Sequence, residues 1–262
     1  MADSDVALDT FSPANRACVR RLLATSRERP DLSGYPQSKL GAVLILLYEE
    51  AGELRVLLTT RSKTLRTHPG QTALPGGRVD DTDASFIETA YREAHEEVGL
   101  PLSSPDIHTV AVLEPAISLY KIIVTPVVAI LTRPSLLNEL KAEESEVFCI
   151  FTHPLRAVLD PTIAKSEPLV DIGTEDWPYE VELHSTSDTV VPLLGNMKYR
   201  MHRFRSSASP IKGLTADLLI QTAKIAFGHS PTYEQYVLGQ LQTFKEISAF
   251  VTDGLIKVKE SA

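Results

Sequence analysis

The chain has 262 residues, 43% of them hydrophobic and 23% charged, proportions that are typical of a soluble globular enzyme. Its 34 acidic side chains outnumber 26 lysines and arginines, so the formal charge is -8, which argues against a protein that coats nucleic acid. The two cysteines, Cys18 and Cys149, are far apart, which disfavours a disulfide framework and favours a reducing compartment. The longest apolar runs, 42–48 and 126–131, are far shorter than the ~20 residues that span a bilayer, so no membrane association is expected.

The two ends of the chain favour an intracellular location. Residues 1–11 contain Asp3, Asp5 and Asp9 and no basic residue, unlike a secretory or mitochondrial leader. The C-terminal Lys-Glu-Ser-Ala differs from a peroxisomal Ser-Lys-Leu signal. We therefore expect a soluble protein of the cytoplasm or the peroxisome, in preference to the mitochondrion.

The first third of the chain predicts a helix followed by a hairpin and a second helix. Ser12 is a suitable cap for a helix over residues 12–25, where apolar side chains recur on one side. After a proline-containing linker, apolar runs at 42–48 and 54–60 flank a polar turn and predict a β-hairpin. A glycine- and proline-rich loop at 62–77 leads to a helix at 83–98 that Gly99 ends.

The rest of the chain predicts further strands and then helices. Strands are expected at 108–113, 122–131 and 146–151, short helical turns at 136–142 and 154–159, a weak strand patch at 179–183, and helices at 213–227 and 232–251. Because strands and helices do not alternate regularly, the pattern predicts an α+β fold with one mixed sheet and helices on both of its faces.

Three glutamates share one side of the helix predicted at 83–98. At roughly 100° per residue, Glu96 lies about 60° to one side of Glu93 and Glu97 about 40° to the other, beside the apolar stripe. Acidic clusters on helices are usually solvated surfaces. Here, however, like charges repeat at three- and four-residue spacing near the helix C-terminus, where the helix dipole also disfavours them. A hard divalent cation would supply the missing counter-charge, so the arc predicts a metal site.

A glycine pair precedes this helix, and the two features together resemble the signature of the Nudix hydrolase family. Gly76 and Gly77 make a turn that lets the backbone approach a metal held by the helix. The spacing to the helix motif is one residue longer than in the general Nudix pattern, and the first acidic position is Asp83 instead of glutamate, so Asp83 receives no metal role. The matching run reads Arg92-Glu93-Ala94-His95-Glu96-Glu97-Val98-Gly99-Leu100.

Residues 57–77 resemble the additional signature of the coenzyme A diphosphatase branch of that family, and 199–216 resemble a C-terminal element of its fungal members. The pattern is Leu-Leu-Thr-x-Arg-Ser, followed by spaced Arg and Gly and by Phe-Pro-Gly-Gly, and only Leu74 departs from it, in place of Phe. The resemblance implies a Nudix-type mixed sheet flanked by helices on both faces, with added N- and C-terminal helices. The implied division is an N-terminal helix and linker at 1–37, a Nudix core at 38–165 and a C-terminal extension at 166–262 packed on the core.

The resemblance also implies an activity: hydrolysis, dependent on Mg²⁺ or Mn²⁺, of the diphosphate bond of coenzyme A or acyl-CoA to 3′,5′-ADP and (acyl-)4′-phosphopantetheine. Its implied partner is therefore a small nucleotide, and no oligomeric state is indicated. The implied metal ligands are Glu93, Glu96 and Glu97, and the implied catalytic residues are Arg92, Glu93 and Glu96. The implied substrate-binding residues are Arg61, Arg66, His68, Gly76 and Gly77.

Several alternatives remain open from the sequence. Another Nudix substrate, such as 8-oxo-dGTP, ADP-ribose or a dinucleotide, would use the same chemistry, and a non-catalytic Nudix binding module would be a different class of protein. Which glutamate acts as the base is not determined, and Glu143 or Glu144, before a later strand, is a further candidate for that role.

Overall fold

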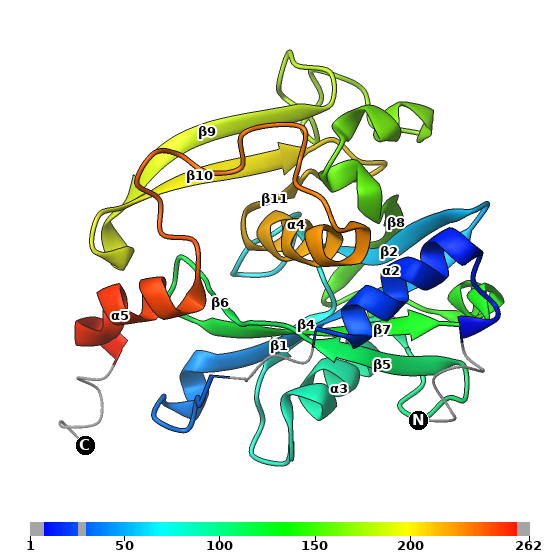
Figure 1. Cartoon of the computed structure of the whole chain (residues 1–262), viewed down its shortest axis with the longest axis horizontal. Helices are drawn as coiled ribbons and strands as arrows, with labels where there is room; N and C mark the ends of the chain where they lie inside the picture. Colours follow the sequence, from blue (N-terminus) through cyan, green and yellow to red (C-terminus); the bar gives the residue numbers. More distant parts are fainter. Residues whose placement is uncertain (1–7, 26–29, 256–262) are drawn as a thin grey trace.

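The computed structural model describes residues 8–25 and 30–255, and a mixed β-sheet runs through its centre (Figure 1). The strand order is β3-β2-β1-β7-β5, with β4 beside β1, β6 beside β7 and β8 beside β2; β1 and β7 are parallel and the other pairs antiparallel. The strands are β1 (Leu40–Glu50), β2 (Glu53–Arg61), β3 (Thr72–Ala73), β4 (Gly76–Arg78), β5 (Ile107–Val112), β6 (Ala116–Ile117), β7 (Ile123–Leu131) and β8 (Val147–Pro154).

Helices cover both faces of this sheet, as the sequence predicts. Helix α3 (Phe86–Val98) packs its alanines on one face, against Leu44, Leu46 and Val127. Helices α2 (Pro13–Leu23) and α4 (Gly213–Phe227) pack on the other face, together with Ile45 and Val128. Successive residues of β1 and β7 therefore point into two separate cores, which explains why these strands are continuous apolar runs.

Local capping sets the limits of α3. Ser85 is the N-cap and its hydroxyl accepts from the N–H of Glu88, while the carboxylate of Glu88 accepts from the N–H of Ala84. The helix thus begins three residues later than the predicted start at 83. Gly99, in the left-handed region with φ 70°, ends it as predicted, and its N–H donates to the carbonyl of His95.

A second, antiparallel sheet lies beyond the core domain and was not predicted. It consists of β9 (His184–Val191), β10 (Met197–Phe204) and β11 (Ile211–Lys212), in the order β11-β10-β9. The predicted strand patch at 179–183 is wrong, because those residues form bends. Most of β9 is exposed and polar, so it lacks the apolar alternation that identifies a strand, and its conformation depends on pairing with β10.

The last predicted helix also differs from the structure. Helix α5 covers Phe244–Leu255, whereas the prediction begins at 232. Backbone contacts hold the preceding segment in an irregular path: the N–H of Thr232 donates to the carbonyl of Leu159, and the hydroxyl of Tyr233 donates to that of Val158. Gly239 adopts φ 83°, which interrupts any helix there.

Short 3₁₀ turns complete the fold, and two of them correspond to the helical turns expected after 131. They are η1 (Gln37–Lys39), η2 (Pro134–Glu139), η3 (Leu155–Val158), η4 (Pro161–Ser166) and η5 (Pro192–Leu194). Across residues 8–25 and 30–255, no helix is long and apolar enough to cross a membrane.

Candidate active site

Two glycines allow the turn before α3 to approach the glutamates of that helix. A Cβ on Gly76, whose φ is 157°, would lie 2.4 Å from the carbonyl oxygen of Ala42 on β1. A Cβ on Gly77 would lie 2.4 Å from the carboxylate carbon of Glu93. Neither position has room for a side chain, so the backbone itself forms one wall of the site.

Glu97 is the most buried of the three helix glutamates, with 4% of the residue exposed. Its Oε2 accepts from the N–H of Gly76 at 3.2 Å, and its Oε1 lies 3.9 Å from Nη1 of Arg61. Burial, together with the charge of Glu93, raises the pKa of Glu97 to about 7 against the opposing effects of the Gly76 hydrogen bond and Arg61. This carboxylate therefore gains from any cation that binds beside it.

Glu93 lies between Glu97 and the outer face of the helix. Burial raises its pKa, the ion pair with Arg92 lowers it, and the charge of Glu96 raises it again. The Glu93 side chain is 17% exposed, whereas that of Glu96 is 54% exposed. The structure thus brings Glu93 and Glu97 together toward the glycine turn and directs Glu96 toward solvent.

Arg92 donates hydrogen bonds to four residues at the edge of this cluster. Its Nε and Nη2 donate to the two carboxylate oxygens of Asp83, each at 2.9 Å. Its Nη1 donates to Glu93 at 2.9 Å and to Glu96 at 3.1 Å, and Nη2 also donates to the carbonyl of Arg78 at 3.1 Å. The paired contact holds the pKa of Asp83 well below its usual range. Asp83 therefore orients Arg92, and Arg92 in turn orients Glu93 and Glu96.

A fourth carboxylate, that of Glu146, acts on the same cluster, and the sequence reasoning missed it. Its negative charge raises the pKa values of both Glu93 and Glu97. It immediately precedes β8, two residues beyond the predicted candidate Glu144. The loop that carries it is fixed to α3, because the N–H of Glu143 donates to the carbonyl of Glu97 at 2.9 Å. Its position directly before a buried strand is the sequence feature that could have identified it.

The basic residues predicted to bind substrate differ in their surroundings: Arg61 lies beside the glutamates, and the other two are exposed. Arg61, at the end of β2, reaches Glu97, and its buried Nε has no hydrogen-bond partner in the described part of the chain. Arg66 and His68 are exposed on the loop between β2 and β3. The His68 ring contacts that of Tyr120 edge-on, with centroids 5.3 Å apart.

Residues 209–215 contact strand β3 and the end of β2, on the chain before the glycine turn. The hydroxyl of Thr72 donates to the carbonyl of Ser209 at 2.6 Å, and the hydroxyl of Thr215 donates to the carbonyl of Thr72 at 3.3 Å. The buried hydroxyls of Thr60 and Ser209 lie 3.2 Å apart. The first turn of α4 is therefore held beside the loop that carries Arg66 and His68.

The chemistry of these side chains fits a hard divalent cation. Glu93, Glu97 and Glu146 offer oxygen donors, and burial together with their mutual repulsion raises the pKa values of Glu93 and Glu97. Within residues 8–25 and 30–255, no three His, Cys, Asp or Glu side chains already converge as a metal cage. The carboxylates of Glu93 and Glu96 are already paired with the guanidinium of Arg92. Binding of a metal ion would therefore require these two side chains to turn.

Comparison with known proteins places this geometry in a known family of domains. Residues 39–166 match the family model described as NUDIX domain. The chain is 34% identical over 200 residues to Nudix hydrolase 15, mitochondrial, of Arabidopsis thaliana, an alignment that covers 74% of this chain and 61% of the relative. It is 36% identical over 196 residues to Nudix hydrolase 22, chloroplastic, of the same plant, covering 74% and 58%.

A bacterial relative matches a shorter region at higher identity. The uncharacterized Nudix hydrolase NudL of Cronobacter sakazakii is 43% identical over 131 residues, which cover 50% of this chain and 66% of that protein. The chain thus spans about three fifths of the plant relatives and just under two thirds of the bacterial one.

Proposed function

We propose that the chain is a Nudix hydrolase whose substrate is coenzyme A or acyl-CoA, on the premise that residues 39–166 match the NUDIX domain model. One observation carries the proposal furthest. Arg61, in the segment that resembles the coenzyme A diphosphatase signature, lies 3.9 Å from Glu97 in the Nudix helix. Arg61, which can bind phosphate, and Glu97, which can hold a cation, thus lie side by side. Hydrolysis of a diphosphate ester requires both functions at one place.

In this proposal, Glu93 and Glu97 hold the cation, with Glu96 or Glu146 as a third ligand. The cation would neutralise the diphosphate oxygens and the leaving group. Arg61 donates to a phosphate oxygen through the guanidinium atoms that Glu97 does not occupy. Two exposed carboxylates, Glu96 and Glu146, are placed to take the proton from the attacking water. Arg92, held by Asp83, keeps Glu93 and Glu96 in position.

The direct test is a substrate panel containing CoA, an acyl-CoA, ADP-ribose, NADH and 8-oxo-dGTP, with products separated by chromatography. We expect 3′,5′-ADP and 4′-phosphopantetheine from CoA, at a kcat/KM at least tenfold above that for the other nucleotides. A higher value for ADP-ribose, NADH or 8-oxo-dGTP would contradict the coenzyme A assignment. It would leave the NUDIX domain assignment intact.

Removal of divalent metal is expected to abolish turnover. EDTA should silence the enzyme, and Mg²⁺ or Mn²⁺ should restore it, since all candidate ligands are oxygen atoms. The cation must displace the proton of Glu97, whose pKa is raised to about 7. The apparent affinity for Mg²⁺ should therefore rise up to about tenfold per pH unit as the pH increases toward 7, and level off above it. Magnesium titrations at pH 6, 7 and 8 check this, and stoichiometric tightly bound zinc would contradict it.

The two arginines are expected to contribute to substrate recognition. A charged contact to phosphate is worth on the order of 1.5–3 kcal/mol, so Arg61→Ala and Arg66→Ala should each lower kcat/KM for CoA roughly ten- to a hundredfold. If the Arg66 contact is to the 3′-phosphate, Arg66→Ala should lower kcat/KM much less for dephospho-CoA than for CoA. Lys63→Ala is the matched control, because this exposed lysine on the same loop is already paired with Glu175. Unchanged kcat/KM for both substrates in both arginine variants would show that this segment does not bind substrate.

A further inference from the structure

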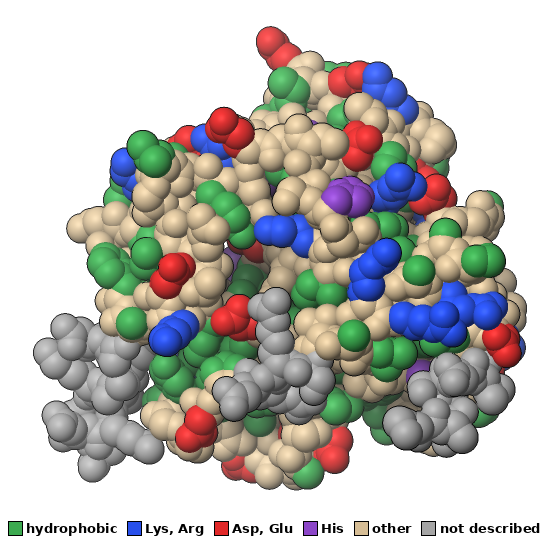
Figure 2. Space-filling model, viewed as in Figure 1, with side chains coloured by type: hydrophobic (Ala, Val, Ile, Leu, Met, Phe, Trp, Pro, Cys, Tyr) green, Lys and Arg blue, Asp and Glu red, His purple; other side chains and the backbone are tan. Residues whose placement is uncertain are grey.

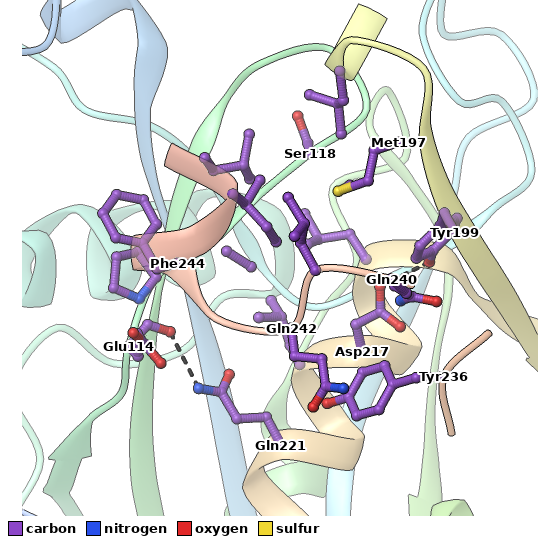
Figure 3. Close-up of a pocket in the computed structure, with 18 of the residues that line it drawn as sticks. Glu114, Ser118, Met197, Tyr199, Asp217, Gln221, Tyr236, Gln240, Gln242 and Phe244 are labelled. Carbon is purple, nitrogen blue, oxygen red and sulfur yellow. Dashed lines mark hydrogen bonds between the residues drawn. The ribbon is translucent and has the colours of Figure 1, made fainter. Parts of the chain in front are cut away.

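A cavity of about 340 Å³ lies between α4, β10, the β6 segment and residues 235–247 (Figure 3). In the space-filling view, the surface is hollowed between α4 and α5, and hydrophobic side chains lie in the hollow (Figure 2). Apolar lining residues come from four separate parts of the chain: Ile117 and Leu119, Leu194 and Met197, Leu218 and Ile225, and Phe244 and Ile247.

Neutral hydrogen-bonding groups interrupt this apolar lining. The carboxylate of Asp217 projects from α4, and its Oδ2 accepts from the hydroxyl of Tyr199 at 2.7 Å (Figure 3). No other hydrogen bond to this carboxylate occurs among the described residues. Burial raises the pKa of Asp217 to about 7, so the protonated form, which can donate as well as accept, is accessible near neutral pH. Gln221 and Gln240 line the same space, and the amide of Gln221 donates to the carbonyl of Glu114 at 3.3 Å.

The charges in the cavity do not suit a phosphate. Its two acidic lining residues, Glu114 and Asp217, offer no positive charge to an anion. Lys224, the lining cation, is already engaged: its Nζ donates to Gln235 at 2.9 Å and lies 5.7 Å from the centroid of the Tyr236 ring. Arg66, an exposed cation on the loop between β2 and β3, suits phosphate better. The cavity therefore fits an uncharged ligand with aliphatic segments and groups that both donate and accept.

Two lining residues of the cavity precede residues that contact the segment between β2 and β4. Leu214 lines it, and the next residue, Thr215, donates to Thr72 beside the glycine turn. Leu119 lines it as well, and the next residue, Tyr120, contacts the ring of His68. From Leu214, the lining positions continue along one face of α4 for about 16 Å at 1.5 Å per residue. A substrate held by the glutamates and Arg61 could thus extend an arm into this space.

We propose that the cavity binds the uncharged, amide-bearing aliphatic arm of the substrate, with Asp217 and Tyr236 as hydrogen-bonding partners for its amides. For coenzyme A this arm is pantetheine, so the proposal rests on the proposed function. The amide N–H donates to a carboxyl oxygen of Asp217, and an amide carbonyl accepts from the hydroxyl of Tyr236 or from protonated Asp217. The cavity would then select substrates with one charged nucleotide side and one neutral side, and disfavour dinucleotides.

Cavity-filling variants test the proposal in the full-length chain. Leu119→Trp and Ile225→Trp fill the space from different elements, so a folding defect in one still leaves the other informative. We expect each folded variant to raise KM for CoA at least tenfold while kcat stays within about threefold. Binding of pantetheine alone, followed by ligand-observed NMR, should be lost. Inhibition by 3′,5′-ADP should be unchanged, because that product lacks the arm. The control is Lys245→Trp, an exposed position on α5 outside the cavity.

The two proposals can fail separately. CoA turnover and pantetheine binding that are unchanged in both folded filling variants would overturn the cavity proposal and leave the proposed function standing. A second possible result is that the wild-type protein turns over another nucleotide and not CoA. That result would overturn the proposed function, and with it the identification of the arm as pantetheine. Asp217→Asn, which keeps an acceptor for Tyr199 but loses the acid, should raise KM for CoA about three- to tenfold. An unchanged KM would remove Asp217 from the recognition scheme.

Discussion

Replacing Glu97 with glutamine is expected to abolish turnover and, at the same time, to stabilise the metal-free protein at alkaline pH. The loss of turnover should be on the order of a thousandfold at saturating Mg²⁺, because the variant lacks a charged oxygen beside the proposed cation. The gain in stability has the same origin. Without metal, Glu97 is a buried carboxylate next to Glu93, and the Gly76 N–H and Arg61, at 3.9 Å, compensate its burial only in part.

The stability effect should depend on pH in a defined direction. The pKa of Glu97 is about 7 in the folded chain and near 4.5 in the unfolded chain, so between these values the folded state binds more protons. Stability of the wild type therefore falls as the pH rises through this window, by about 3 kcal/mol once the pH exceeds 7. Glutamine has no proton to lose. In urea unfolding in the presence of EDTA, the free energy of unfolding should be the same for Glu97→Gln and wild type at pH 4.5. At pH 8 the two should differ by the full amount.

Glu96→Gln provides the matched control. Its side chain is 54% exposed and already paired with Arg92, so its removal should not change stability by more than about 0.5 kcal/mol at either pH. Turnover of Glu97→Gln within a few-fold of wild type would contradict the metal-ligand assignment. A stability gain that is equal at both pH values would contradict the pKa argument.

The parts of the fold that are encoded locally could be predicted from the sequence. Gly99 ends α3 and the apolar runs of β1 and β7 mark buried strands, because each signal lies within a few residues of the element it defines. Strand β9 carries no such signal: its side chains are mainly exposed, and only pairing with β10 fixes its conformation. The irregular segment before α5 likewise depends on contacts with Val158 and Leu159, more than 70 positions away.

The same distinction applies to the candidate site. The sequence indicates which glutamates share a side of α3, but the helical wheel cannot separate Glu97 from Glu96. The sheet and the glycine turn determine which of them is buried. The role of Asp83 also depends on folding, since its contact with Arg92 requires the loop before the helix to fold back. Glu146 approaches the cluster only because β8 pairs with β2.

The two adjacent glycines allow the site to be tested with one methyl group at a time. At Gly76, the Cβ would lie 2.4 Å from the carbonyl oxygen of Ala42 and 2.6 Å from the Cα of Val43, both backbone atoms, and φ is 157°. Gly76→Ala should therefore destabilise the fold by about 3 kcal/mol or more. At Gly77, the Cβ would instead meet the carboxylate of Glu93, the mobile end of a side chain.

Gly77→Ala is accordingly expected to cost less than about 1 kcal/mol in stability but to lower kcat/KM at least about a hundredfold, because Glu93 must leave the position that Arg92 gives it. Thermal unfolding and kinetics on the same preparations measure both effects. Added Mg²⁺ should stabilise the wild type but not Gly77→Ala, since the displaced carboxylate can no longer share the cation with Glu97. Full activity in Gly77→Ala would mean that the position of Glu93 is not critical. Glu97, with Glu96 or Glu146, would then remain to hold the metal.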